Sequence, residues 1–185
     1  MRQKIGKEKI VKAALMLFSE NGYHKTSISQ IAKKADVSKG LTYNYFKSKE
    51  ELLLYLIDEA TNEMLSVSGD LKPSLNYEET LEQTLEQFVL FLKQNKNYLT
   101  FQLSLLFQPD LRKIVIKPLQ RRAEHLLRQT KAMFDKAGID NPTLTARRFL
   151  AELDGIALHE LSVFKNYPLD EMHKQIYNSY RNINK

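Results

Sequence analysis

The fold is decided by residues 26–49, TSISQIAKKADVSKGLTYNYFKSK. A hydroxyl at Thr26 or Ser27 can accept a hydrogen bond from the first turn of a short helix and so cap it. The apolar residues of that helix recur at helical spacing, namely Ile28, Ile31, Ala32 and Ala35. A tight turn over residues 36–38 follows, and Ser38 caps a third helix from Lys39 to about Phe46. Two short helices joined by about three residues, the second capped and basic, have the form of a helix-turn-helix.

One helix precedes this stretch and another follows it. The preceding helix has an apolar stripe and ends in a C-terminal cap at Asn21-Gly22; the stripe consists of Ile10, Ala13, Ala14, Leu17 and Phe18. On the other side, Ser48 and Glu51 have the spacing of a capping box. This box predicts a fourth helix from Lys49 to about Ser66.

The rest of the chain is also expected to be helical. Apolar periodicity predicts helices near residues 77–94, 97–107, 110–137, 143–165 and 168–184, and Pro118 is expected to kink or split the third of these. No run of alternating apolar and polar residues predicts a strand. The predicted fold is therefore all-α with about nine helices. Residues 1–48 would form a helix-turn-helix domain, and residues 49–185 a helical effector-binding and dimerisation domain.

Composition excludes several classes of function. The 185 residues include no cysteine, which excludes disulfides, thiolate metal sites and cysteine nucleophiles. The four histidines lack the spacing of a metal site, and no catalytic triad, P-loop or paired-carboxylate motif is found. No apolar run is long enough to span a membrane. We therefore expect a cytoplasmic protein that is not an enzyme and needs no metal or cofactor.

Positive charge is concentrated at the start of the chain. Residues 1–50 carry 11 Lys and Arg against 4 Asp and Glu, whereas the remaining 135 residues carry 17 against 18. A small basic module on a nearly neutral body is typical of a nucleic-acid-binding protein with a second function. A solvated basic face without a partner is the alternative.

The third helix has side chains suited to a DNA major groove. Gly40 allows close approach, and Lys39 can donate to guanine O6 or N7. Tyr43 and Tyr45 offer flat rings for thymine methyl groups and hydroxyl groups for phosphates. Lys49 and Thr26 lie at helix starts, where they would add phosphate contacts.

The order of these motifs resembles the DNA-binding domain of the tetracycline-repressor (TetR) family. The matching residues run over about residues 8–55 as Ile10-x-x-Ala13-Ala14-x-x-Leu17-Phe18, Gly22-Tyr23-x-x-Thr26-Ser27-Ile28-x-x-Ile31-Ala32-x-x-Ala35-x-Val37-Ser38-Lys39-Gly40 and Tyr43-x-Tyr45-Phe46-Lys47-Ser48-Lys49-Glu50-x-Leu52. The resemblance implies DNA contacts at Thr26, Ser38, Lys39, Gly40, Leu41, Tyr43, Asn44, Tyr45 and Lys49.

The resemblance also implies how such a protein works. It implies a homodimer formed through helices near 143–165 and 168–184, bound to a palindromic double-stranded operator. A small-molecule effector in the C-terminal domain would move the two DNA-binding heads apart and release the operator. The family is usually repressive, so we expect a ligand-responsive repressor. The alternative is a helical ligand-binding or interaction protein whose helix-turn-helix no longer binds DNA.

One pair of residues departs from the family pattern. The family usually has a small or polar residue facing DNA at position 41 and an apolar residue facing the core at position 42, but this chain has Leu41-Thr42. Either the helix keeps its register, with Leu41 toward thymine methyl groups and Thr42 inside, or it is rotated so that Leu41 packs inward. The first arrangement is favoured because Tyr43, Tyr45 and Phe46 keep their positions.

Effector-binding residues are harder to select from the sequence. Candidates are Phe101, Leu105, His125 and Asp154. Helical periodicity cannot separate the lining of a pocket from ordinary core, so core packing is the alternative for Phe101 and Leu105. Surface or interface positions are the alternatives for His125 and Asp154.

Overall fold

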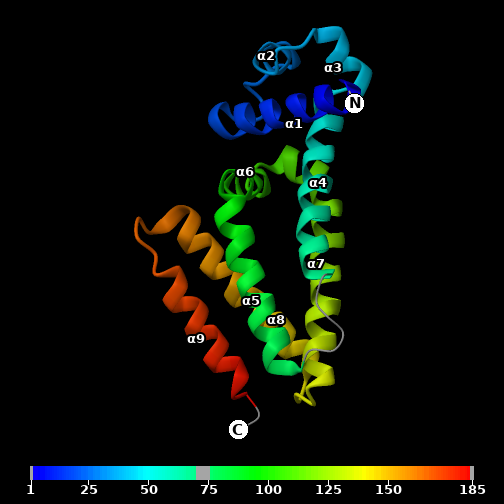
Figure 1. Cartoon of the computed structure of the whole chain (residues 1–185). Helices are drawn as coiled ribbons and strands as arrows, with labels where there is room; N and C mark the ends of the chain where they lie inside the picture. Colours follow the sequence, from blue (N-terminus) through cyan, green and yellow to red (C-terminus); the bar gives the residue numbers. More distant parts are fainter. Residues whose placement is uncertain (1, 70–75, 184–185) are drawn as a thin grey trace. The chain divides into compact units, whose positions relative to one another are not determined.

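The computed structural model describes residues 2–69 and 76–183, and within these residues it contains α-helices, one π-helix and no strand (Figure 1). The helices are α1 (Arg2–Asn21), α2 (Ile28–Lys34), α3 (Lys39–Tyr45), α4 (Lys49–Gly69), α5 (Tyr77–Gln94), α6 (Lys96–Leu106), α7 (Pro109–Lys136), α8 (Pro142–Leu158), the π-helix η1 (His159–Val163) and α9 (Leu169–Arg181). The predicted all-α fold with about nine helices is confirmed.

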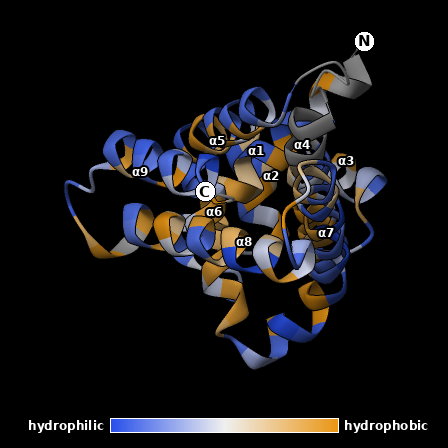
Figure 2. Ribbon diagram, turned by 90° about the horizontal axis from the view of Figure 1, so that it is seen from below, coloured by the Kyte–Doolittle hydropathy of each residue, from blue (hydrophilic) through white to orange (hydrophobic). Residues whose placement is uncertain are grey.

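The end of α1, the course of α7 and the end of α8 each bear on a prediction from the sequence. Gly22 ends α1 with a φ of 80°, in the left-handed region that a residue without Cβ adopts at little cost. Pro118 does not split the helix, since α7 continues through it, and the alternative of a kink there stays a prediction. In place of a single helix over 143–165, the α-helix α8 ends at Leu158, and the π-helical turn η1 follows it. The helices carry both apolar and polar residues along their length, as amphipathic helices do (Figure 2).

The chain forms two compact units. The first contains the described residues up to Ala60 together with Asn97–Leu119, and the second contains those of Thr61–Lys96 and Gln120–Lys185. This division by packing differs from the predicted boundary after Ser48. That boundary was drawn around the DNA-binding function, and it stays a prediction.

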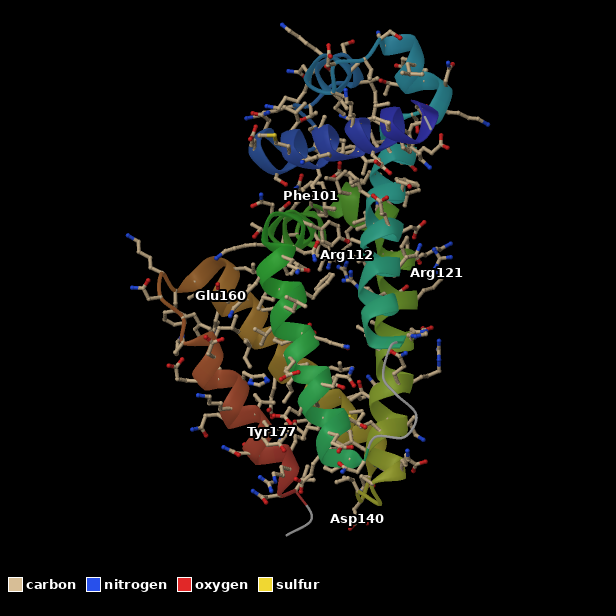
Figure 3. All side chains as sticks on the ribbon, in the orientation of Figure 1. Phe101, Arg112, Arg121, Asp140, Glu160 and Tyr177 are labelled. Carbon is tan, nitrogen blue, oxygen red and sulfur yellow. The ribbon has the colours of Figure 1, made fainter. Side chains whose placement is uncertain are left out.

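The core of the first unit joins the helix-turn-helix to α6. Phe18 of α1 is buried and its ring stacks on Phe101 of α6, with centroids 5.6 Å apart (Figure 3). Ile31 and Phe46 are buried in the same cluster, as is Leu105. Burying each side chain of this size contributes about 1.5–3 kcal/mol. These contacts therefore hold the helix-turn-helix against α6.

The second unit is held together by α9 packed along α5 (Figure 1). The Tyr77 hydroxyl donates to the Tyr180 carbonyl oxygen at 2.9 Å near one end of the pair. Lys93 lies 3.0 Å from the carboxylate of Asp170 near the other end. The two helices are therefore antiparallel and are fastened at both ends.

Aromatic rings form the core of this second unit. Phe134, Phe149 and Tyr180 are fully buried, and the ring centroids of Phe149 and Tyr180 lie 4.8 Å apart in an edge-on arrangement. Such pairs contribute about 0.5–1.5 kcal/mol beyond the burial of their area. Helices α7, α8 and α9 each supply one of the three rings.

Candidate nucleic-acid interface

Side-chain hydroxyl groups fix the two short helices as the sequence predicts. Ser27 caps α2 by accepting from the Gln30 N–H, and the Gln30 side chain accepts from the Ser27 N–H. Asp36 adopts a φ of 55° in the turn after α2. Ser38 then caps α3 by accepting from the Leu41 N–H at 3.0 Å. The predicted helix-turn-helix is thus built from local capping at both helix starts.

Ser48 and Glu51 organise the start of α4 in a variant of the predicted capping box. The Ser48 hydroxyl accepts from the Glu51 N–H at 3.0 Å. The Glu51 carboxylate accepts from the N–H of Lys47, at 2.6 Å, rather than from that of Ser48. This bond fixes the chain leaving α3.

Helix α3 exposes one face and buries the other. Lys39, Gly40, Tyr43 and Asn44 are exposed, and the Tyr43 side chain is 45% accessible to solvent. Thr42 and Phe46 are buried in the core. Four of the predicted DNA-contacting residues therefore lie on one accessible surface.

The structure keeps the register that the sequence favoured for the swapped pair. Thr42 is completely buried, whereas Leu41 is half-buried. Leu41 lies over Gly6 of α1, together with Tyr45, and the Tyr45 hydroxyl is 3.4 Å from where a Cβ of Gly6 would be. Leu41 and Tyr45 thus pack partly on α1, and only part of their surface is available to DNA.

An open concavity of about 500 Å³ lies beside the exposed face of α3. It is lined by the end of the α1–α2 turn, the start of α2, α3 and the start of α4. The lining residues are His24, Lys25, Thr26, Ser27, Ile28, Ser29, Lys39, Tyr43, Lys47, Ser48 and Lys49. They include four lysines and no carboxylate. Such a surface attracts phosphate groups.

The lysines of the concavity differ in their surroundings. Lys25, Lys39 and Lys47 are exposed. The Lys39 ammonium lies 5.9 Å from the centre of the Tyr43 ring, within the range of a cation–π contact. Because their stems are in solvent, these three ammonium groups can reach a bound phosphate.

Thr26 lies inside the turn between α1 and α2. Its side chain is buried, and its hydroxyl lies 2.9 Å from the Gly22 carbonyl oxygen and 3.1 Å from that of Leu17. A hydroxyl has a single proton to donate, and these inward carbonyls take it. The Thr26 hydroxyl therefore stabilises the turn, and the predicted phosphate contact of Thr26 stays a prediction.

Lys49 also points toward protein rather than solvent. Its ammonium donates to the carbonyl oxygens of Tyr23 and Thr26 at 2.9 Å each, and that of His24 lies at 3.5 Å. Burial lowers the pKa of Lys49 from its ordinary value. The predicted phosphate contact of Lys49 is not tested by this geometry and stays a prediction.

Sequence analysis missed several residues of the concavity. Lys47 was part of the quoted stretch but was not selected, and neither were Lys25 and Ser29. Lys39 and Tyr43 lie one turn apart on α3, whereas Lys47 follows that helix, so the basic sequence Lys47-Ser48-Lys49 could have indicated it. No signal in the sequence indicated that His24 lines the concavity. Its Nε2 lies 2.9 Å from the carboxylate of Asp110 in α7, a partner that is far from it in the chain.

The four candidate effector residues do not form one cluster in either unit. Phe101 and Leu105 are buried in the core cluster of the first unit, and their pocket role stays a prediction, because a buried side chain can also line a pocket. His125 and Asp154 belong to the second unit. Asp154 is accessible, but desolvation by crowding atoms raises its pKa, and the charge of Arg122 partly offsets this. Pocket roles for His125 and Asp154 stay predictions.

The described residues offer neither a cluster of metal ligands nor a membrane-spanning helix. In the part of the chain that the structure describes, no group of three or more His, Asp or Glu side chains could hold a metal ion. Within the same residues, no helix is both long and apolar enough to cross a membrane.

Comparison with known proteins gives one consistent result. Residues 10–56 match the family model described as "Bacterial regulatory proteins, tetR family". The "Fatty acid metabolism regulator protein" of Bacillus subtilis (strain 168) is 34% identical over 99 residues, which cover 52% of this chain and 51% of that protein. The chain therefore matches about half the length of this relative, and about a third of the next two.

Two other similarities extend over nearly the whole chain. The "HTH-type transcriptional regulator BetI" of Proteus mirabilis (strain HI4320) is 26% identical, and the match covers 93% of this chain and 88% of that protein. The crystal structure of a transcriptional regulator of the "TerR/AcrR family" from Aquifex aeolicus VF5 has a TM-score of 0.77 at 26% identity. That likeness covers 96% of this chain and 99% of the other.

Proposed function

Because this chain belongs to the TetR family of transcriptional regulators, we propose that it is an effector-responsive homodimeric repressor of a palindromic operator. The observation that carries the proposal is the lysine-lined concavity beside the exposed face of α3. A protein bound to chromosomal DNA would act in the cytoplasm.

Phosphate contacts would supply most of the affinity for DNA. Lys25, Lys39 and Lys47 would each neutralise one phosphate and release its counterion. Each such contact contributes about 0.9 to the slope of log K against log salt concentration. Binding should therefore weaken steeply as salt rises.

Base contacts would come from the accessible face of α3. Lys39 can donate to guanine, and Gly40 lets the start of the helix approach the groove. The Tyr43 ring and the Asn44 amide stand on the same exposed face. Two copies of this face, about one helical turn of DNA apart, would match a palindrome.

An apolar surface on the second unit supports a homodimer. Leu144, Leu158, Val163 and Phe164 are all exposed along α8 and the segment that follows it, with Leu144 69% accessible. Gly155 on α8 has open space where a Cβ would lie, so another helix could approach there closely. A second copy of the chain would cover these side chains and remove them from water.

An effector would act by favouring one spacing of the two DNA-binding heads over the other. Asp154 supports such a site in the second unit, since its carboxylate is accessible yet crowded and has Arg122 close enough to influence its pKa. Ligand binding and operator binding would then weaken each other by the same factor.

The proposal is tested by a mobility-shift experiment on the DNA upstream of the protein's own gene. The wild-type protein should form a specific complex at low salt, and Tyr43→Ala should weaken it because that side chain is exposed on α3. Lys136→Met at the end of α7 removes a charge from an exposed position outside α8 and α9, the helices of the proposed dimer interface, and should change nothing. Absence of a specific complex, with no effect of Tyr43→Ala, would favour the alternative of a helix-turn-helix that no longer binds DNA.

A further inference from the structure

The His24 side chain joins the turn between α1 and α2 to the start of α7, within the first unit. Its Nε2 lies 2.9 Å from the carboxylate of Asp110. Its ring stands at 86° to the ring of Tyr23, with the two centroids 5.5 Å apart. The carboxylate and the tyrosine ring therefore fix the orientation of the imidazole.

His24 also lines the lysine-rich concavity, whereas Asp110 is not one of its lining residues. Both side chains are more than half exposed, so a phosphate group can reach the imidazole. A protonated imidazole has two N–H donors. With Nε2 facing Asp110, the donor at Nδ1 remains for a second acceptor.

Charged groups around His24 have opposing effects on its protonation. The lysines of the concavity disfavour a further positive charge, and the Asp110 carboxylate favours it. Glu50 of α4 also acts on this turn, since burial raises the pKa of Tyr23 and the charges of Glu50 and Asp110 raise it further. The titratable and charged groups concerned are Tyr23, Lys25, Lys39, Lys47, Lys49, Glu50 and Asp110.

Bound DNA would change this balance in favour of the protonated form. Its phosphates would neutralise the lysines and so remove their repulsion of a positive imidazole, and one phosphate oxygen would accept from Nδ1. Histidine ordinarily changes its charge between pH 5 and 8. If DNA favours the protonated form, protonation favours DNA binding by the same factor, and the affinity rises as the pH falls through this range.

We propose that His24 is a phosphate-binding residue of the DNA site that acts in its protonated form, with Asp110 as the positioning residue that orients its imidazole and favours its positive charge. This inference rests on the proposed DNA-binding function. It adds a residue to those that the family resemblance implies, and it makes the affinity for DNA depend on pH.

The test follows binding of a random 30-base-pair duplex by fluorescence anisotropy from pH 5.5 to 8.5. The salt slope is measured at both ends of this range between 50 and 200 mM salt, and circular dichroism checks the fold of each variant there. Wild-type binding at pH 8.5, where histidine is ordinarily neutral, tests the proposed function separately. No binding there at low salt would refute the proposed function, and this inference with it.

The wild-type protein should bind about tenfold more tightly at pH 5.5 than at pH 8.5, the scale of one hydrogen bond to a charged group. Its salt slope should be steeper at the lower pH by about 0.9 for each bound head, the value for one added phosphate contact. His24→Gln keeps a polar side chain that carries no charge, and both differences should vanish. Their persistence in His24→Gln would overturn the proposal. An equal wild-type salt slope at both pH values would also overturn it, because the proton would then add no phosphate contact.

Asp110→Asn tests the carboxylate. Asparagine keeps the shape of the side chain but removes the charge that favours a positive imidazole, so the rise in affinity should begin at a lower pH than in the wild type. Asp135→Asn is the matched control, because it removes an exposed carboxylate near the other end of α7, in the second unit, and should leave the pH profile unchanged. A wild-type pH profile in Asp110→Asn would refute the role given to Asp110.

Discussion

Replacing Thr42 by valine should stabilise the protein, although the change lies in the middle of the helix that faces DNA. The Thr42 side chain lies on the inner face of α3 and is completely buried. The acceptor for its hydroxyl is the Ser38 carbonyl oxygen, 3.5 Å away, and that oxygen already accepts the Thr42 N–H at 3.2 Å. A bond of this length is at the limit of a hydrogen bond.

The magnitude follows from two opposing terms. Burying a hydroxyl costs about 1–3 kcal/mol on the basis of protein mutations. A good internal hydrogen bond returns about 0.5–1.5 kcal/mol, and this long one belongs at the lower end. Valine has nearly the same shape and the same branching at Cβ, so helix propensity hardly changes. We therefore expect Thr42→Val to raise the free energy of unfolding by about 1 kcal/mol.

The assay is thermal unfolding followed by circular dichroism, together with urea unfolding. For a chain of this size, 1 kcal/mol corresponds to about 2–4 °C in Tm. Thr42→Ser is the matched control, because it keeps the hydroxyl and loses a methyl group, and should destabilise by about 1 kcal/mol. A loss of 1 kcal/mol or more in Thr42→Val would refute the reasoning, since the hydroxyl would then be a well-bonded part of the core.

Three further predictions concern other helices. Gly6→Ala should raise Tm, because alanine favours a helix by about 1 kcal/mol over glycine and its Cβ would meet Leu41 and Tyr45 at ordinary contact distances of 3.4 to 3.6 Å; a lower Tm would show that α1 and α3 pack more tightly. Tyr77→Phe should cost about 1 kcal/mol at pH 7 through the lost bond to the Tyr180 carbonyl. Since burial raises the pKa of Tyr77 from 10.0 to about 12, the folded state holds this proton longer, and wild-type stability should fall from pH 10 to about 12 more steeply than that of Tyr77→Phe. Asp154→Asn should raise Tm at pH 7, because desolvation raises the pKa of Asp154 and so penalises the ionised folded form; this advantage should shrink as the pH is lowered toward 3.8, and an equal advantage at both pH values would contradict it.

The features that sequence analysis predicted well depend on chemistry within a few residues. Ser27 and Ser38 cap their helices as expected, because a cap needs a hydroxyl and an N–H three positions later. The end of α1 at Gly22 follows from the backbone freedom of one residue. Such signals are complete in the local sequence, so no knowledge of the packing is required.

The surroundings of two predicted contact residues depend on partners outside their own helices, and their phosphate contacts stay predictions. Thr26 and Lys49 were both assigned to phosphate on the basis of their place at helix starts. The Thr26 hydroxyl bonds back to Leu17, and the Lys49 ammonium reaches Tyr23. A polar side chain at a helix start can face solvent or the protein, and only the packing of α1 against α4 decides between the two.

Periodicity leaves a similar ambiguity for apolar residues. Phe101 and Leu105 follow a helical stripe, which fits a pocket lining as well as a core. Both are buried in the structure, which fits either interpretation, so their pocket role stays a prediction. The π-helical turn at His159–Val163 was also missed, because an apolar stripe does not distinguish 3.6 residues per turn from a single wider turn.

The exchanged order of Leu41 and Thr42 shows how packing can separate two functions within one helix. With Thr42 inside, Leu41 is placed over Gly6, where a side chain of α1 larger than that of alanine would push it away. Leu41 and Tyr45 then pack partly on α1, and their predicted DNA contacts stay predictions. Lys39, Tyr43 and Lys47 are left as the exposed row beside the concavity. Substitutions in this row should therefore change DNA binding with little effect on stability, whereas substitutions at Gly6 or Leu41 should change stability first and DNA binding only through the position of the helix.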